Sequence, residues 1–187
     1  MVQTTKRLCT FEEYLAYHDD TDQRYELVDG ELVPVPPATG RHGKIGRFLF
    51  KQFDTEIERL NLPWVACYGD VGVRTAERRS RIPDLMIITK EQEQATLDIS
   101  AVVQSAPLLV VEIVSENYAA TDYRYKRSEY AVRGIPEYWI VDFYENKVTV
   151  LLLVEGFYDE QIFRGDERIV SRTFPELMIT AAQVLQG

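Results

Sequence analysis

Two acidic side chains interrupt the most apolar parts of this chain, and their chemistry is the first feature to explain. Glu112 lies in the middle of a continuous apolar run over residues 107–115, and Asp84 follows Pro83 in a second apolar run. Such short runs are typical of strands that are covered on both faces. An unpartnered carboxylate on a buried strand is strongly destabilising, whereas a pair of carboxylates that shares a cation is not. We therefore expect Asp84 and Glu112 to bind one divalent metal ion, Mg²⁺ or Mn²⁺.

A lysine, Lys126, follows the second acidic strand on the next predicted helix. Two carboxylates can hold Mg²⁺ through oxygen ligands, and the ion polarises a phosphate and lowers the barrier to forming hydroxide from water. A nearby lysine can orient that water or offset negative charge in the transition state. Asp84, Glu112 and Lys126 together are the minimum set of groups for hydrolysing a phosphodiester bond.

A sheet and a crossover helix are needed to bring these three residues together. Residues 82–89 and 107–114 are predicted to form the two acidic strands. Residues 119–133 predict a helix, which a Gly and a Pro stop, and residues 137–142 predict another strand. The order strand–helix–strand fits a βαβ crossover, which places its two strands parallel.

The rest of the chain predicts a mixed α/β fold in one domain over residues 1–187. The longest predicted helix spans residues 40–61, is amphipathic and precedes the sheet. An Asp29-Gly30 pair between two apolar segments predicts a hairpin over residues 24–33. The other predicted elements are a short helix over 10–18, strands over 64–68 and 71–74, a partly helical segment over 90–104, a hairpin of 147–154 with 157–163, and a helix over 180–186.

Composition places the chain among globular proteins. Of its 187 residues, 45% are hydrophobic and 27% are charged, which excludes a disordered chain. The sequence shows neither a run long enough to span a membrane nor the apolar core of a signal peptide. We therefore expect a cytoplasmic protein that does not enter a membrane. Cys9 and Cys67 suit neither a zinc site nor a disulfide framework and are expected to be reduced thiols.

The charge distribution bears on nucleic-acid binding. A net charge of −9 argues against a simple nucleic-acid binder, because phosphate contacts need positive surface. Basic residues nevertheless gather in the middle of the chain, in clusters that each alone suit a solvated helix face or a loop tip. Their joint placement around the two acidic strands favours a surface that faces phosphates. The clusters are Arg41, Lys44, Arg47 and Lys51; Arg74, Arg78, Arg79 and Arg81; and Arg124, Lys126, Arg127 and Arg133.

The order of these residues resembles the PD-(D/E)-x-K nuclease superfamily, and most of the chain resembles its Uma-like family of bacterial putative restriction endonucleases. No single motif is specific, but the whole series in this order is. The resemblance implies a restriction-endonuclease-like fold and a Mg²⁺-dependent endonuclease that cuts DNA. Enzymes that cut both strands of a duplex mostly present two sites, so a homodimer is expected. The matching segments are 25–32 (YELVDGEL), His42 at the start of the long helix, Pro83-Asp84, 111–115 (VEIVS), 122–126 (DYRYK) and 137–142 (EYWIVD).

The chain departs from the superfamily pattern at one position. The pattern places its lysine two residues after the second acidic residue, where this chain has Val114. The resemblance suggests that the lysine has moved to the following helix as Lys126, one helical turn after Asp122. The alternative is that Asp122 and Lys126 form an ordinary surface salt bridge, which would contribute only a few tenths of a kcal/mol.

Other polar residues allow two interpretations each. Glu26, on the first predicted hairpin, is either a third carboxylate or orienting base of the metal site, or a solvent-facing residue. His42 could bind a phosphate or a water at a helix N-terminus, although a capping or surface role is favoured. His18 is interpreted as a surface residue, and Asp142 as the cap of a turn.

Aromatic residues concentrate around the crossover, where core packing or a dimer face is favoured over stacking on bases. They are Tyr118, Tyr123, Tyr125, Tyr130, Tyr138 and Trp139.

Two rival functions remain open. One is a non-catalytic dimeric binding module that keeps the nuclease fold, which the acidic net charge and the displaced lysine favour. The other is a metal-dependent hydrolase of RNA or of a small phosphoester.

Overall fold

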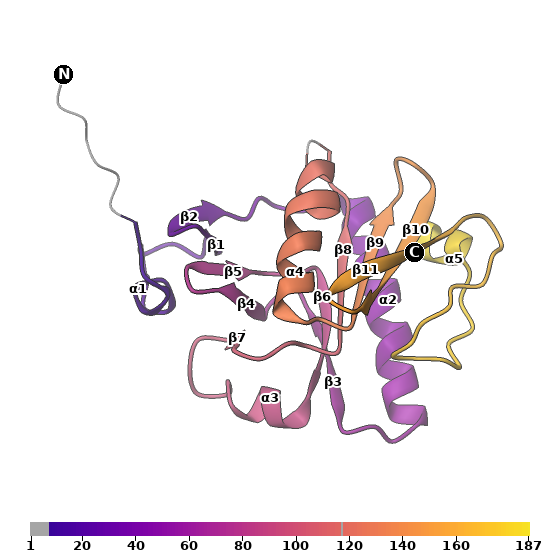
Figure 1. Cartoon of the computed structure of the whole chain (residues 1–187), viewed down its shortest axis with the longest axis horizontal. Coiled ribbons are helices and arrows are strands. Elements are labelled where there is room, and N and C mark those ends of the chain that lie inside the picture. Colours follow the sequence, from indigo (N-terminus) through magenta and orange to yellow (C-terminus); the bar gives the residue numbers. More distant parts are fainter. Residues whose placement is uncertain (1–7, 117) are drawn as a thin grey trace.

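The computed structural model describes residues 8–116 and 118–187, and its centre is a six-stranded sheet (Figure 1). The strand order is β11-β10-β9-β8-β6-β3. Neighbouring strands are antiparallel except for β8 and β9, which are parallel. The parallel direction predicted for the two strands of the βαβ crossover is therefore confirmed. The strands are β3 (Trp64–Tyr68), β6 (Leu85–Thr89), β8 (Leu109–Ile113), β9 (Glu137–Asp142), β10 (Lys147–Val154) and β11 (Phe157–Phe163).

A second sheet of five short strands lies beside the central sheet, in the order β2-β1-β5-β4-β7. Its first hairpin turns at Asp29 and Gly30, whose φ angles of 53° and 86° are those of a type I′ turn. The predicted hairpin over residues 24–33 is thereby confirmed. The strands are β1 (Tyr25–Val28), β2 (Glu31–Pro34), β4 (Gly72–Ala76), β5 (Arg79–Arg81) and β7 (Val102–Val103).

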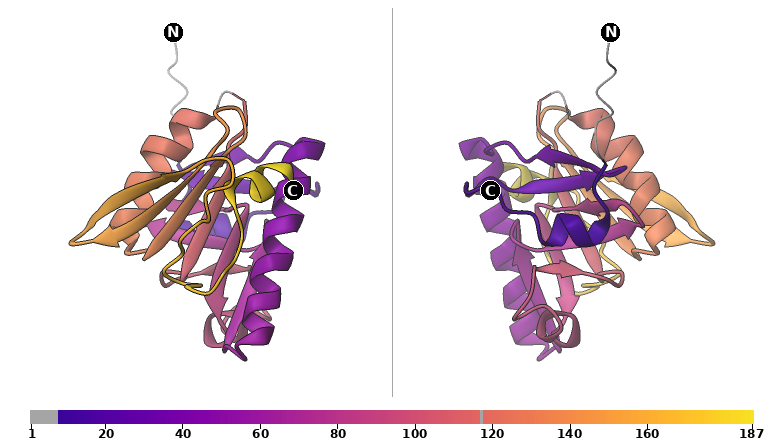
Figure 2. Two further views of the ribbon diagram at one scale, coloured as in Figure 1. Left: turned by 90° about the vertical axis from the view of Figure 1, so that its right-hand side faces the viewer. Right: turned by 90° about the vertical axis from the view of Figure 1, so that its left-hand side faces the viewer.

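Helices cover both faces of the central sheet (Figure 2). The long helix α2 (Gly40–Arg59) and the C-terminal α5 (Ala181–Gln186) pack on one face, where Leu49, Phe53 and Trp139 belong to the larger core. On the other face lies α4 (Arg127–Arg133), which follows a π-helical turn, η1 (Thr121–Lys126). Two short helices, α1 (Phe11–Leu15) and α3 (Lys90–Gln94), complete the described chain.

The crossover helix differs from its prediction in one respect that concerns the site. The helix predicted over residues 119–133 is present, but its part over Thr121–Lys126 is π-helical. The end agrees with the prediction, because Gly134 adopts the left-handed conformation (φ 83°) that commonly follows a helix C-terminus. Within the described residues, no helix combines the length and the apolar character needed to cross a membrane.

The strand expected over residues 82–89 begins later than predicted, because β6 of the central sheet starts at Leu85. The preceding Arg79–Arg81 forms β5 of the smaller sheet. Pro83, between them, has no N–H to donate to a ladder, so the chain leaves one sheet before it enters the other. Asp84 therefore lies at a corner, directly before β6, rather than inside a strand.

Candidate functional site

Asp84 and Glu112 line the same groove. Strands β6 and β8 pair with Leu85 opposite Val111, so Asp84, which directly precedes β6, lies beside the end of β8 that carries Glu112 and Ile113. Both residues line one groove of about 1020 Å³, here called the central groove, together with Lys126 and Glu26. The structure thus brings all four predicted site residues to one concave surface.

Asp84 is held at two points. Its Oδ2 accepts a hydrogen bond of 2.7 Å from the backbone N–H of Ile113, and its Oδ1 lies 2.8 Å from Nε2 of His42. The Asp84 side chain keeps 24% of its surface exposed, so it remains open to the groove. The carboxylate is therefore fixed in direction without being closed off from a ligand.

His42 is a buried partner of Asp84 rather than a surface residue. Only 7% of it is exposed, because it shares the buried face of α2 with Ile45 and Leu49. Its Nδ1 lies 3.4 Å from the hydroxyl of Ser115, which follows β8. The signal was present in the sequence: positions 42, 45 and 49 follow the helical period of the apolar face.

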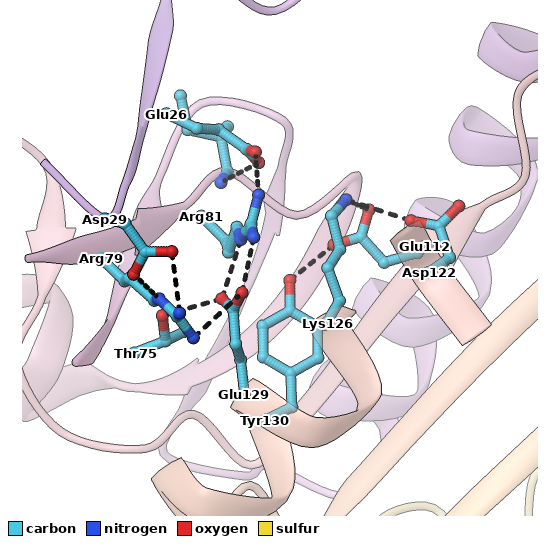
Figure 3. A network of polar contacts seen from close by, with 11 residues as sticks. Glu26, Asp29, Thr75, Arg79, Arg81, Glu112, Asp122, Lys126, Glu129 and Tyr130 are labelled. Atoms are coloured by element: carbon cyan, nitrogen blue, oxygen red, sulfur yellow. Dashed lines mark hydrogen bonds and ion pairs between the residues drawn. The ribbon is translucent and has the colours of Figure 1, made fainter. Parts of the chain in front are cut away.

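Glu112 is almost fully buried, at 3% exposure, and is held by two side chains of the crossover helix (Figure 3). The hydroxyl of Tyr130 donates to its Oε1 over 2.6 Å, and Nζ of Lys126 lies 2.7 Å from its Oε2. The same ammonium is 3.2 Å from Oδ1 of Asp122. The Asp122–Lys126 pair is thus real, but it is buried and shared with Glu112 rather than on the surface.

The electrostatics of this cluster are those of crowded carboxylates around one ammonium. Burial raises the pKa of Glu112, against the lowering effect of Lys126, and the negative charges of Asp84 and Asp122 raise it further. Burial alone would lower the pKa of Lys126, but attraction to Glu112 and Asp122 outweighs it and raises that pKa. Lys126 therefore keeps its proton, while the carboxylates lie where additional positive charge would be favourable.

Glu26 also lines the central groove and is 9% exposed. Its Oε2 pairs with Nη1 of Arg81 at 2.9 Å, and its Oε1 accepts from the backbone N–H of Ile82 at 3.0 Å. The solvent-facing interpretation of this residue does not describe its position. Its effect on the acidic cluster is electrostatic, since it also contributes to the raised pKa values of Lys126 and Asp122.

A buried ion-pair network that the sequence did not reveal joins the smaller sheet to α4 (Figure 3). Arg81 contacts both oxygens of Glu129, from Nε at 2.8 Å and from Nη2 at 2.5 Å. Glu129 also accepts from the hydroxyl of Thr75 at 3.1 Å. Arg81 and Glu129 lie 48 positions apart, a separation at which no local pattern predicts a contact. The network fixes the helix that carries Lys126 and Tyr130.

Most aromatic residues of the crossover fall into two groups, and the remaining Tyr123 is half-buried and donates its hydroxyl to Asp142. Tyr130, Tyr138 and Trp139 are buried, as the core-packing interpretation predicted. Tyr118 and Tyr125 are exposed and line the central groove. Asp142 accepts from the backbone N–H groups of residues 144 and 145, which agrees with its interpretation as the cap of a turn.

The donor chemistry of the groove fits Mg²⁺ or Mn²⁺. Asp84 and Glu112 offer carboxylate oxygens, the ligands such ions prefer, and the mutual repulsion around Glu112 would be relieved by a cation. Over residues 8–116 and 118–187 no group of three or more His, Cys, Asp or Glu side chains is arranged to hold a metal. Mg²⁺ commonly keeps several waters and takes only one or two protein carboxylates, so a pair of ligands suffices.

Comparisons with known proteins agree on family and fold. A model of the Uma2 family, described as "Putative restriction endonuclease", matches residues 11–182. The uncharacterized protein sll1609 of Synechocystis sp. (strain ATCC 27184 / PCC 6803 / Kazusa) is 26% identical over 144 residues, which cover 76% of this chain and 79% of that protein. The crystal structure of a putative nuclease of the DUF820 group from Anabaena variabilis ATCC 29413 superposes with a TM-score of 0.78 at 18% identity, covering 94% of this chain and 97% of the other. The predicted restriction-endonuclease-like fold is confirmed by this likeness.

Proposed function

The chain belongs to the Uma2 family, whose model covers residues 11–182, and from this membership we propose that it is a Mg²⁺-dependent endonuclease that hydrolyses the phosphodiester bonds of DNA. Family membership and the shared fold with a solved putative nuclease support a nuclease-like function. The requirement for Mg²⁺, and DNA as the substrate, are the parts that the proposal adds.

Asp84 and Glu112 are the proposed metal ligands. Both residues line the central groove, and Asp84 is already oriented by the N–H of Ile113. A bound Mg²⁺ would supply positive charge that polarises the scissile phosphate and makes an attacking water easier to deprotonate. Mn²⁺ has similar ligand preferences and is expected to substitute for it.

Lys126 is proposed to act as a fixed positive charge. Because Glu112 and Asp122 raise its pKa, its ammonium keeps its proton and cannot serve as a general base at neutral pH. A protonated ammonium at the groove can hydrogen-bond a water or a phosphate oxygen and offset charge that develops in the transition state. Its position on the crossover helix, rather than at position 114, thus still brings it 2.7 Å from Glu112.

Glu26 is proposed to orient the site rather than to transfer a proton. Both of its oxygens are engaged, one by Arg81 and one by the N–H of Ile82. Through Arg81 it contacts Glu129 on α4, the helix that continues from Lys126. Loss of Glu26 would leave a buried guanidinium with half of its partners, which is costly.

The observation that carries the proposal is the convergence of Asp84, Glu112 and Lys126 in one groove. The test is cleavage of plasmid DNA and of circular single-stranded DNA with Mg²⁺ or Mn²⁺, comparing wild type with Asp84→Ala. Asp84→Asn keeps an acceptor for the Ile113 N–H and controls for folding. Asp159→Ala, an exposed carboxylate on β11 away from the groove, is the matched control. Equal cleavage by Asp84→Ala and Asp159→Ala, or no cleavage by wild type, would reject the proposal.

A non-catalytic binding module is the second candidate, and one observation favours it. The ammonium of Lys126 already neutralises part of the charge of Glu112 and Asp122, and no ready-made cluster of three metal-binding side chains lies in the described part of the chain. Calorimetric titration separates the candidates. Binding of Mn²⁺ that Asp84→Ala abolishes supports the nuclease, and a folded wild type that binds neither Mn²⁺ nor Mg²⁺ supports the binding module.

A homodimer is proposed as well, because cutting both strands of a duplex mostly requires two sites. Light scattering on the purified chain tests this, and a monomer at every concentration would contradict it. RNA or a small phosphoester in place of DNA would be recognised by cleavage of those substrates in preference to DNA. A cytoplasmic location remains a prediction from composition.

A further inference from the structure

Three exposed tyrosines stand at the edge of the central sheet where the parallel strands β8 and β9 end. Tyr118 follows β8, Tyr144 follows β9, and Tyr125 lies on η1 between those strands in sequence. They are 50%, 48% and 65% exposed, respectively, and all three line the central groove. In open α/β sheets, ligands bind in the crevice outside the carboxyl ends of the strands. The metal-site proposal assigns no role to these rings.

The π-helical turn η1 presents different residues to the core and to the groove. Asp122 and Lys126 are buried, with Lys126 in contact with Glu112, whereas Arg124 and Tyr125 are exposed. Single π-helical turns occur frequently at functional sites. The same short element therefore holds the candidate ammonium and offers an aromatic ring and a guanidinium to a ligand in the groove.

The groove has little free positive charge for a phosphate backbone. Carboxylates outnumber arginines and lysines along its walls, and Arg79, Arg81 and Lys126 are each occupied by ion pairs. Among the residues described by the structure, Arg24 and Arg124 are the groove-lining cations outside an ion pair. Proteins that hold duplex DNA through its backbone neutralise many phosphates with lysines and arginines. Two free guanidinium groups, in a chain with a net charge of −9, are too few to neutralise a duplex backbone in this way.

We infer that the central groove takes a single-stranded segment of DNA, in which unpaired bases stack on Tyr118, Tyr125 and Tyr144. This inference rests on the proposed function, in that DNA is the substrate. Stacking on aromatic side chains needs no backbone-wide positive surface and tolerates any sequence, because every base has a flat face. Arg24 and Arg124 then contact individual phosphates. The substrate class is single-stranded DNA, including the unpaired ends and flaps of a duplex.

Binding of labelled oligonucleotides in EDTA tests the inference without cleavage. Fluorescence anisotropy compares a single-stranded DNA, the duplex of the same sequence and an RNA of the same sequence. We expect the single-stranded DNA to bind at least about tenfold more tightly than the duplex. Tyr125→Ala should weaken single-strand binding about tenfold, and Tyr125→Phe should bind like wild type because the ring remains. Phe157→Ala removes a 78% exposed ring on β11 outside the groove and should change nothing.

The outcomes separate this inference from the proposed function. Duplex or RNA binding as tight as or tighter than single-stranded DNA overturns it, as does no binding to any oligonucleotide. Equal effects of Tyr125→Ala and Phe157→Ala also overturn it. If single-stranded DNA is preferred in EDTA but wild type cuts no DNA with Mg²⁺ or Mn²⁺, the inference holds as a binding mode and the nuclease proposal fails. If wild type cuts DNA but binds duplex better, the nuclease stands and the inference fails.

Discussion

Two buried carboxylates on the neighbouring parallel strands β8 and β9 have opposite surroundings. Glu137, at the start of β9, is fully buried and is surrounded by neutral donors. Its Oε1 accepts from the Trp139 indole N–H at 2.7 Å and from the Ser171 hydroxyl at 2.8 Å. Its Oε2 accepts from the N–H and the hydroxyl of Thr173, at 2.6 and 2.7 Å. Glu112, near the end of β8, shares an ammonium with another acid instead.

The difference shows how a structural carboxylate can be told from a candidate catalytic one. Glu137 does not line the central groove, and its donors tie the C-terminal segment to the sheet. Glu112 does line the groove, and burial together with Asp84 and Asp122 raises its pKa. A buried acid in an apolar strand is therefore not a functional signal by itself. Access to a groove and concentrated like charge are what distinguish Glu112.

The largest expected effect is on catalysis. Glu112→Gln should lower DNA cleavage about 10³-fold, because it removes a proposed ligand of the metal ion on which transition-state stabilisation depends. Glu137→Gln should keep cleavage within about threefold of wild type per folded molecule, because Glu137 lies away from the groove. Initial rates with Mg²⁺ under conditions where both variants are folded provide the measurement. Similar losses in the two variants would remove the distinction between the two acids.

The loss of unfolding free energy should be larger for Glu137 variants than for Glu112 variants, the reverse of the order for cleavage. Glu137→Ala should lower the free energy of unfolding by about 3 kcal/mol, because buried donors of Trp139, Ser171 and Thr173 lose their acceptor. Glu112→Ala should cost less, about 2 kcal/mol: the Tyr130 hydroxyl loses its acceptor, but Lys126 keeps Asp122 as a partner and repulsion from Asp84 is relieved. Urea unfolding followed by circular dichroism measures both values. A larger loss for Glu112→Ala than for Glu137→Ala would contradict this reasoning.

Metal binding should stabilise the folded protein only where the ion binds in the central groove. At an Mn²⁺ concentration about 100 times its dissociation constant, the wild type should gain about 2.7 kcal/mol in unfolding free energy. Asp84→Ala should lose this gain, and Asp159→Ala should keep it, because only Asp84 lines the groove. Thermal unfolding with and without Mn²⁺, with EDTA as the reference, reports the difference. A metal-induced shift that survives in Asp84→Ala would place the ion elsewhere.

Local sequence patterns predicted most of the fold because they report burial and backbone conformation. The apolar run at 107–115 and the Gly134 stop identified β8 and the end of the crossover helix, and both are found where expected. The later start of the strand expected over 82–89 follows from Pro83, which has no N–H to donate to a sheet. That the preceding Arg79–Arg81 joins a different sheet depends on tertiary structure. The π-helical turn had no comparable local signal, since its residues are compatible with an α-helix.

Only the charged residues of the candidate site could be predicted from the sequence. Asp84 and Glu112 were identifiable because charges in or beside apolar runs need partners. Lys126 was identifiable from its place on the following helix together with the family resemblance. The partners themselves, such as Tyr130 on Glu112, come from elements that meet only in three dimensions. Whether an acid faces a groove or neutral donors is likewise a tertiary property, which is why Glu137 gave no sequence signal of its structural role.

The smallest expected effect concerns the hydroxyl that Tyr130 donates to Glu112 over 2.6 Å. Tyr130→Phe leaves the ring packed in the core but removes one of the two groups that orient the carboxylate, so cleavage should fall about tenfold. Tyr158→Phe is the matched control, because its buried hydroxyl donates over 2.7 Å to the carbonyl of Ile135, outside the groove. Both variants lose a buried hydrogen bond and should lose about 1 kcal/mol of unfolding free energy. Only Tyr130→Phe should lose activity, since only its hydroxyl acts on the acid that faces the groove. Equal cleavage by the two variants would show that Glu112 needs no orientation from α4.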